Sequence, residues 1–154
     1  MARTRKSWQE KLADAKAKPG LPKEFYCRKS RQHFVVASPE EIEQIIRTVK
    51  RGELVTIAQI GQRLKVAHDV DVACPITTGI FTWLIANAAQ EATDQGRKGV
   101  PPWWRVLKTG GLLNPKFPGG GRTQKAMLQA EGHKVVPKGK ALIVANYEDA
   151  LVRS

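Results

Sequence analysis

The chain has 154 residues, 42% of them hydrophobic, which is enough apolar material for one folded domain and argues against global disorder. No apolar run reaches the roughly 18 residues of a membrane-spanning helix, and the first residues lack the apolar segment of a signal peptide, so we expect a cytoplasmic protein with no membrane partner. The formal net charge of +12 favours a polyanionic partner, most often nucleic acid.

The N-terminal part of the chain is predicted to be a basic arm that carries a helix. Residues 1–33 hold ten Lys and Arg against three acids, and residues 7–18 have the pattern of a short amphipathic helix that "KPGLPKEF" ends. We assign residues 1–37 to this arm and residues 38–154 to a single folded domain. Whether the arm is ordered or a loose basic tail is left open by the sequence.

Two capping boxes predict the next two helices. Ser38 and Glu41 precede a stripe of isoleucines, with a proline in the first helical turn, and so predict a helix that ends near Gly52. Thr56 and Gln59 have the same spacing in "TIAQIGQRL" and predict a second short helix.

A long third helix is expected to begin near Pro75. Ile76, Ile80, Leu84 and Ala88 recur at helical spacing, and they predict an apolar face along this helix. A linker, "TDQGRKGVPP", follows it.

The C-terminal part is predicted to hold the β structure. A strand is expected over 104–107, then a turn, the glycine-rich loop "NPKFPGGG", a helix in "RTQKAMLQAEG" and a hairpin made by "HKVV" and "KALIVANY". Two short helices, a longer helix and a strand-rich wing describe a winged helix-turn-helix. We therefore expect a mainly α fold with a small β wing, an N-terminal helical arm and a C-terminal β-hairpin.

Cysteine and histidine usage indicates neither a metal site nor a cofactor. Cys27 and Cys74 lie far apart and outside any CxxC pair, and the three histidines are scattered. Distant cysteines in a cytosolic chain are more often free thiols than a disulfide.

Four segments resemble the DNA-binding domain of the O6-alkylguanine-DNA alkyltransferases. "VTIAQIGQRL", "PWWRV", "FPGG" and "QAEG" occur in the family's order, and the resemblance covers roughly residues 38–136. These repair enzymes have Pro-Cys-His-Arg-Val around the cysteine that accepts the alkyl group. Here Trp103 stands at the cysteine position and Trp104 at the histidine position.

That substitution is similar to the alkyltransferase-like proteins, which bind alkylated guanine in DNA and transfer nothing. Alkyl transfer needs an activated thiolate, and an indole has neither a reactive lone pair nor an ionisable proton near neutral pH. The resemblance therefore implies a non-enzymatic, monomeric protein without catalytic residues that binds alkylated guanine in duplex DNA. It also implies that the lesion is flagged for repair, with nucleotide excision repair proteins as partners.

The resemblance implies a base-binding pocket. Trp103 would stack on an extruded base, Asn87 would brace the turn, and Arg105 would either bond backbone carbonyls of the loop or contact phosphate. The residues expected in the pocket are Trp103, Trp104, Arg105, Asn87, Phe117, Pro118, Gly119, Gly120 and Glu131.

DNA contacts are expected around this pocket, although the family's pattern is incomplete. Thr78 stands where the family has the arginine that fills the gap left by a flipped base, and Ile57 stands near the position of its tyrosine. The long helix has no Lys or Arg between residues 75 and 92. The residues expected to contact DNA are Thr56, Ile57, Thr77, Thr78, Phe81, Thr82, Lys108, Lys116, Arg122 and Lys125.

Two other functions remain open at this point. The charge and the missing flipping residues also suit a winged-helix regulator that binds undamaged DNA or RNA. Cys74, at the start of the long helix, where the helix dipole lowers a thiol pKa, would be the nucleophile of a divergent enzyme.

Overall fold

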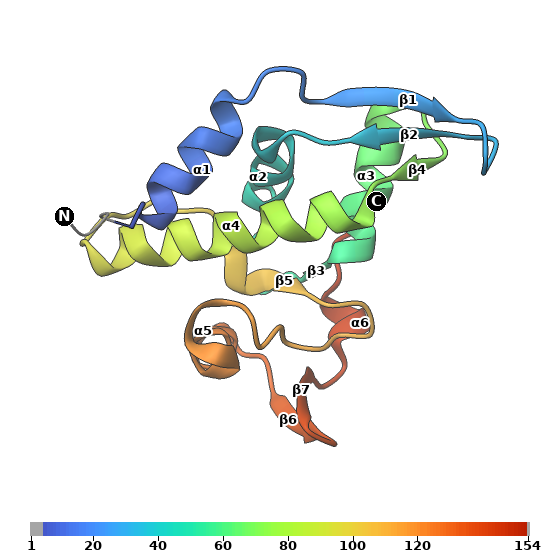
Figure 1. Ribbon diagram of the computed structural model, residues 1–154. Helices are drawn as coiled ribbons and strands as arrows, with labels where there is room; N and C mark the ends of the chain where they lie inside the picture. Colours follow the sequence, from blue (N-terminus) through green and yellow to red (C-terminus); the bar gives the residue numbers. More distant parts are fainter. Residues whose placement is uncertain (1–4, 154) are drawn as a thin grey trace.

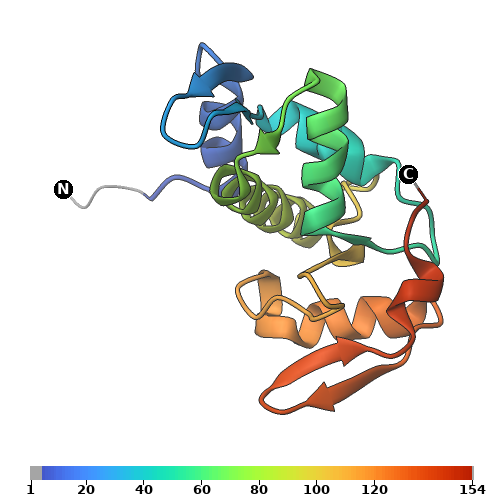
Figure 2. The same cartoon turned by 90° about the vertical axis from the view of Figure 1, so that its right-hand side faces the viewer.

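A long central helix organises the fold. The computed structural model describes residues 5–153, and α4 (Pro75–Asp94) runs through the middle of them (Figure 1). Three helices lie on one side of α4: α1 (Trp8–Ala17), α2 (Pro39–Arg47) and α3 (Ile57–His68). On the other side lie α5 (Arg122–Ala130) and the short α6 (Tyr147–Ala150), a division that Figure 2 shows from a second direction.

Three small sheets complete a mixed α/β fold. The first has the order β1-β2-β4, with β1 antiparallel and β4 parallel to β2: β1 (Lys23–Cys27), β2 (Gln32–Val36) and β4 (Val72–Ala73). The second is a short parallel pair: β3 (Val55–Thr56) and β5 (Val106–Leu107). The third is the expected C-terminal hairpin: β6 (Val135–Lys138) and β7 (Ala141–Val144).

Both predicted capping boxes are confirmed. The Ser38 hydroxyl accepts the N–H of Glu41 and the Glu41 carboxylate accepts the N–H of Ser38, which starts α2 at Pro39. Thr56 and Gln59 exchange the same pair of bonds at the start of α3. Each box satisfies two of the backbone donors that a helix N-terminus leaves free, so the boundaries follow directly from the sequence.

The face that α4 buries differs from the predicted one. Ile76 is 72% exposed and Ile80 is 49% exposed, so the predicted stripe faces outward in the first half of the helix. The buried side chains of α4 are mostly small: Thr78, Thr82, Ile85, Ala86, Ala88, Ala89 and Ala92. Because α4 packs against α1, α2, α3 and the turn at Trp103, small side chains let several elements approach it closely.

The predicted strand over 104–107 begins two residues late. Trp103–Arg105 form a 3-10 turn, η1, and only Val106 and Leu107 are paired as β5. Pro101 and Pro102 fix the approach to this turn, and the N–H of Trp103 donates to the Pro101 carbonyl at 2.7 Å. The two tryptophans therefore do not alternate across a strand; their rings lie edge to face at 6.2 Å.

The described part of the expected N-terminal arm packs against the rest of the chain. The N–H groups of Trp8 and Gln9, in the first turn of α1, both donate to the Glu91 carboxylate of α4 at 3.1 Å. A carboxylate at a helix N-terminus satisfies free donors and complements the helix dipole. The β1–β2 hairpin was not predicted from the sequence. Its strand β2 also pairs with β4, which lies just before α4 in the chain.

His68 links the hairpin to two helices. It lies at the C-terminal end of α3, and its ring nitrogens contact Glu24 of β1, at 2.8 Å, and Glu41 of α2. Burial alone lowers the pKa of His68, but the hydrogen bonds and charges of the two carboxylates outweigh burial and raise this pKa above 6.5.

We predict that the stabilisation from this contact decreases as the pH rises. A folded-state pKa above the unfolded value stabilises the folded protein fully below about pH 6.5, and the stabilisation is lost as the pH passes through the raised folded pKa. The measurement is the free energy of urea unfolding of the protein and of His68→Gln between pH 5.5 and 8.5. The difference between them should shrink toward high pH, and a constant difference would contradict the assignment.

Candidate nucleic-acid interface

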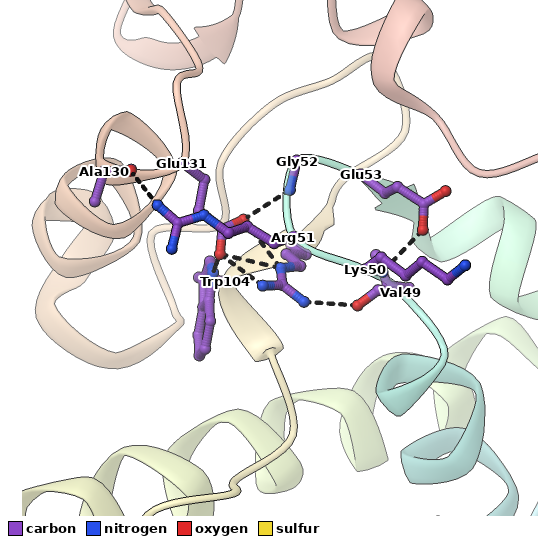
Figure 3. A network of polar contacts seen from close by, with 9 residues as sticks. Val49, Lys50, Arg51, Gly52, Glu53, Trp104, Ala130 and Glu131 are labelled. Carbon is purple, nitrogen blue, oxygen red and sulfur yellow. Dashed lines mark hydrogen bonds and ion pairs between the residues drawn. The ribbon is translucent and has the colours of Figure 1, made fainter.

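Trp104, Arg105 and Glu131 come together in an interior polar network (Figure 3). Arg105 donates to both oxygens of the Glu131 carboxylate, with Nη2 to Oε2 at 2.7 Å and Nε to Oε1 at 3.0 Å. The Trp104 indole N–H donates to Oε2 at 2.9 Å. The Arg105 side chain is 13% exposed and that of Glu131 is 8% exposed, so the ion pair is largely shielded from water.

The network joins the end of α5 to the segment between α2 and β3. Arg105 Nη1 donates to the Val49 carbonyl at 2.6 Å, and the Gly52 N–H donates to Glu131 at 3.4 Å (Figure 3). Arg51 donates to the Ala130 carbonyl at 3.2 Å. Arg105 was expected to bond carbonyls of the glycine-rich loop or to contact phosphate, but the carbonyl that it bonds is that of Val49, outside this loop.

Glu131 is held as a carboxylate by its donors. Burial would raise its pKa, but the hydrogen bonds from Arg105 and Trp104 and the positive charge of Arg105 outweigh burial and lower it. Trp104 only donates, because an indole N–H has no lone pair to accept a proton. The network can therefore position side chains but cannot carry a proton relay.

Trp103 and Phe117 lie in the core, where an open pocket was expected. Trp103 is 0% exposed and Phe117 is 3% exposed, and their rings meet edge to face at 6.0 Å. The Trp103 indole nitrogen has no hydrogen-bond partner in residues 5–153. The 3-10 turn at Trp103 directs this side chain inward, so neither ring offers a free face to a base in this conformation.

The glycine-rich loop forms a tight turn next to Phe117. Pro118 begins the 3-10 turn η2 (Pro118–Gly121), and Gly119 and Gly120 have φ angles of 79° and 63°. A Cβ on Gly119 would lie 2.0 Å from the Thr123 hydroxyl oxygen, so only glycine fits there. Both glycines are exposed, and their backbone lies at the surface.

Gln124 holds this loop in place and was missed by the sequence analysis. Its fully buried side chain donates to the carbonyls of Trp104, at 3.1 Å, and Val106, at 2.8 Å. Its amide oxygen accepts the N–H of Asn114 at 3.3 Å. A buried glutamine that bonds three backbone groups fixes the loop relative to β5, because leaving any of them unpaired would be costly.

An open groove lies between the first half of α4 and the loop before Phe117. Its volume is about 700 Å³, and the Trp83 indole N–H closes one side by donating to the Lys116 carbonyl at 3.1 Å. The groove is lined by Pro75, Ile76, Gly79, Ile80, Trp83, Asn114 and Lys116. The exposed isoleucines of α4 thus form the apolar side of a cleft with a polar, cationic rim.

A second groove, of about 400 Å³, lies between α3 and α4. Ile57 and Lys65 line it from α3, Thr78 lines it from α4, and Pro75 lines both grooves. The two hollows therefore meet at the N-terminal end of α4.

The residues expected to contact DNA divide between surface and interior. Thr56, Thr78 and Thr82 are buried and form backbone-directed hydrogen bonds in or next to helices, instead of facing outward. Asn87 donates to the Trp83 carbonyl of its own helix and does not brace the turn. Lys108, Lys116 and Arg122 are exposed, whereas the remaining expected contacts are partly buried: Ile57, Thr77, Phe81 and Lys125.

Two solved structures are similar to this chain. One is S. pombe Atl1 in complex with damaged DNA containing O6-carboxymethylguanine, with a TM-score of 0.54. The other is S. pombe ATL in complex with DNA, with a TM-score of 0.56. Each is 14% identical and the match covers 75% of this chain and 94% of the other. This chain has the Atl1 fold.

The likeness to Atl1 agrees at the level of the fold with the resemblance stated from the sequence. No family model matches the sequence, and no curated protein matches it. Within residues 5–153, no helix is long and apolar enough to cross a membrane, and no three His, Cys, Asp or Glu side chains are grouped as metal ligands.

We predict that Arg105→Met destabilises the fold by about 3–5 kcal/mol, because it leaves the buried Glu131 carboxylate unpaired. Chemical unfolding measures this loss. Arg105→Met combined with Glu131→Leu removes both charges and should recover much of the stability. A double variant no more stable than Arg105→Met would show that the pair is not the source of the loss.

Proposed function

We propose that this chain is a non-enzymatic duplex-DNA-binding protein that recognises alkylated guanine in the groove between α4 and the Asn114–Phe117 loop. The observation that carries the proposal is this groove, an apolar cleft with a cationic rim, on a fold shared with Atl1 bound to DNA containing O6-carboxymethylguanine. Binding would flag the lesion for repair by other proteins. In this proposal α3 and α4 act as a helix-turn-helix pair and the β structure after α4 forms the wing.

The groove suits an alkylated base taken out of the duplex. Ile76, Ile80 and Trp83 supply apolar surface for a planar ring and its alkyl group, and Asn114 supplies an amide at the rim. Unstacking a base costs a few kcal/mol, less for a damaged pair, and contact with an aromatic ring returns about 1–3 kcal/mol. The two terms are comparable, so added apolar contact with an alkyl group can decide which bases enter.

Phosphate contacts would come from outside α4, which has no Lys or Arg between residues 75 and 92. Lys116 lines the groove, and Lys108 and Arg122 are exposed on neighbouring segments of the chain. Trp103 acts on the groove indirectly. Its ring packs against that of Phe117, the residue that follows Lys116 in the chain. A buried tryptophan therefore shapes the groove without touching the base.

Neither tryptophan can accept an alkyl group. By the resemblance stated from the sequence, Trp103 and Trp104 stand where the enzymes have their cysteine and histidine, and neither indole is a nucleophile near neutral pH. The remaining nucleophile near the groove is Cys74. Burial raises the pKa of its thiol, but the hydrogen bonds from the Thr77 hydroxyl and nearby backbone N–H groups lower it overall.

We predict that Ile76→Ser lowers affinity for duplex DNA containing O6-methylguanine by roughly 5- to 30-fold, from the loss of about 1–2 kcal/mol of apolar contact. Affinity for the same duplex with guanine should change little. The matched control is Val66→Ser on α3, since Val66 is also 72% exposed and lines neither groove. Fluorescence anisotropy with both duplexes measures the six affinities of the unaltered protein and the two variants.

Two outcomes of this binding assay would contradict the proposal. Equal affinity of the unaltered protein for both duplexes would favour the alternative, a winged-helix regulator that binds undamaged DNA. A retained lesion preference in Ile76→Ser would place the base elsewhere.

We also predict no covalent product after incubation with O6-methylguanine DNA. Intact-protein mass spectrometry should show no gain of a methyl group. Cys74→Ser provides the comparison, since a gain seen only in the protein with Cys74 would identify a divergent enzyme.

A further inference from the structure

The β1–β2 hairpin carries a cluster of unpaired positive charges. Lys23, Arg28, Lys29 and Arg31 are all exposed, and none forms an ion pair with another residue in the part of the chain that the structure describes. The only acid in residues 23–36 is Glu24, which is bound to His68. Three of the four cations lie within four residues at the turn, where they repel one another unless an anion is near.

The hairpin is held firmly in one place. Glu24 contacts His68 at 2.8 Å, and the Asp71 carboxylate accepts the N–H of His33 at 2.8 Å. Phe25 and Phe34 stack across the strands at 5.4 Å. Anchored cations lose less conformational freedom on binding than those of a loose tail, so they suit a ligand at a fixed position.

Strand pairing places the hairpin next to the proposed DNA-binding surface. β2 pairs with β4, and after Cys74 the chain enters α4 at Pro75, the residue that lines both grooves. Phe34 lies opposite Val72 in this parallel pairing, so from there β2 leads back toward Arg31 in the direction away from Pro75. The turn therefore lies beyond Asp71, which lines the second groove and accepts the N–H of His33. Figure 1 shows the hairpin extending past the N-terminal end of α4.

Arg31 occupies a position where a glycine would fit better. Its φ angle is 55°, in the left-handed region that an L-residue enters at a cost and that glycine adopts freely. The turn therefore carries an arginine at the expense of backbone stability. A purely structural turn gains nothing from the charge.

We propose that the β1–β2 hairpin is a second contact with DNA, and that its turn binds the phosphate backbone of the duplex beside the grooves. The inference rests on the proposed function for the identity of the polymer. Each strand of a duplex carries one negative charge about every 3.4 Å along the axis, so a backbone that passes the second groove and reaches the turn offers several phosphates to its three cations. The contact adds affinity to any sequence and leaves lesion preference to the groove.

The test compares the salt dependence of binding for matched charge variants. The hairpin variant is Arg28→Gln with Lys29→Gln and Arg31→Gln. The control is Lys18→Gln with Lys50→Gln and Lys98→Gln, which removes equal charge from exposed positions outside both grooves. The plot of log K against log salt has a negative slope, and each lost phosphate contact should reduce its magnitude by about 0.9. The magnitude should therefore fall by roughly 1.8–2.7 in the hairpin variant and hardly at all in the control.

The variant Arg31→Gly separates the effect of the charge on DNA binding from the effect of the residue on stability. Glycine relieves the left-handed backbone, so the melting temperature should stay the same or rise while the slope falls by about 0.9. In the hairpin variant, the ratio of affinities for O6-methylguanine and guanine duplexes should equal that of the unaltered protein.

The outcomes distinguish the hairpin from the groove. An unchanged slope in the hairpin variant, or an equal loss in the control, overturns the proposal and leaves the hairpin to another partner such as an acidic protein. A protein that shows no lesion preference but loses slope in the hairpin variant refutes the proposed function and supports the hairpin contact.

Discussion

The buried pair between Arg105 and Glu131 is the interaction on which the rest of the interface depends. It joins the end of α5 to the segment before β3, and so connects the parts of the chain on the two sides of α4. A desolvated ion pair contributes little net stability, but removing one partner leaves an expensive charge behind. The pair therefore constrains the position of η1 and the end of α5 relative to the α2–β3 segment.

The groove follows from that arrangement. With η1 and α5 fixed, Gln124 bonds the carbonyls of Trp104 and Val106 and the N–H of Asn114, which sets the start of the loop. Phe117 then packs on Trp103, and Trp83 donates to the Lys116 carbonyl. Gln124, Trp103 and Phe117 act from behind the groove, whereas Trp83, Asn114 and Lys116 are held in place and also line it.

Local signals predicted the helices, whereas the site depended on contacts that local signals do not contain. The capping boxes at Ser38 and Thr56 set helix starts because both partners lie within one turn. The periodicity of α4 did not reveal that Ile76 is exposed, because helices that bury alanines on several sides have no single apolar stripe. Gln124 resembles any polar residue in a helix, and only its partners 10 to 20 residues earlier show why it is buried.

The two tryptophans act on the candidate site through packing and hydrogen bonding. Trp104 donates to Glu131, so the carboxylate remains bound although an indole cannot accept a proton. Trp103 is fully buried and its ring packs edge to face against Phe117. Both tryptophans therefore influence the cleft beside α4 through the residues that they hold in place.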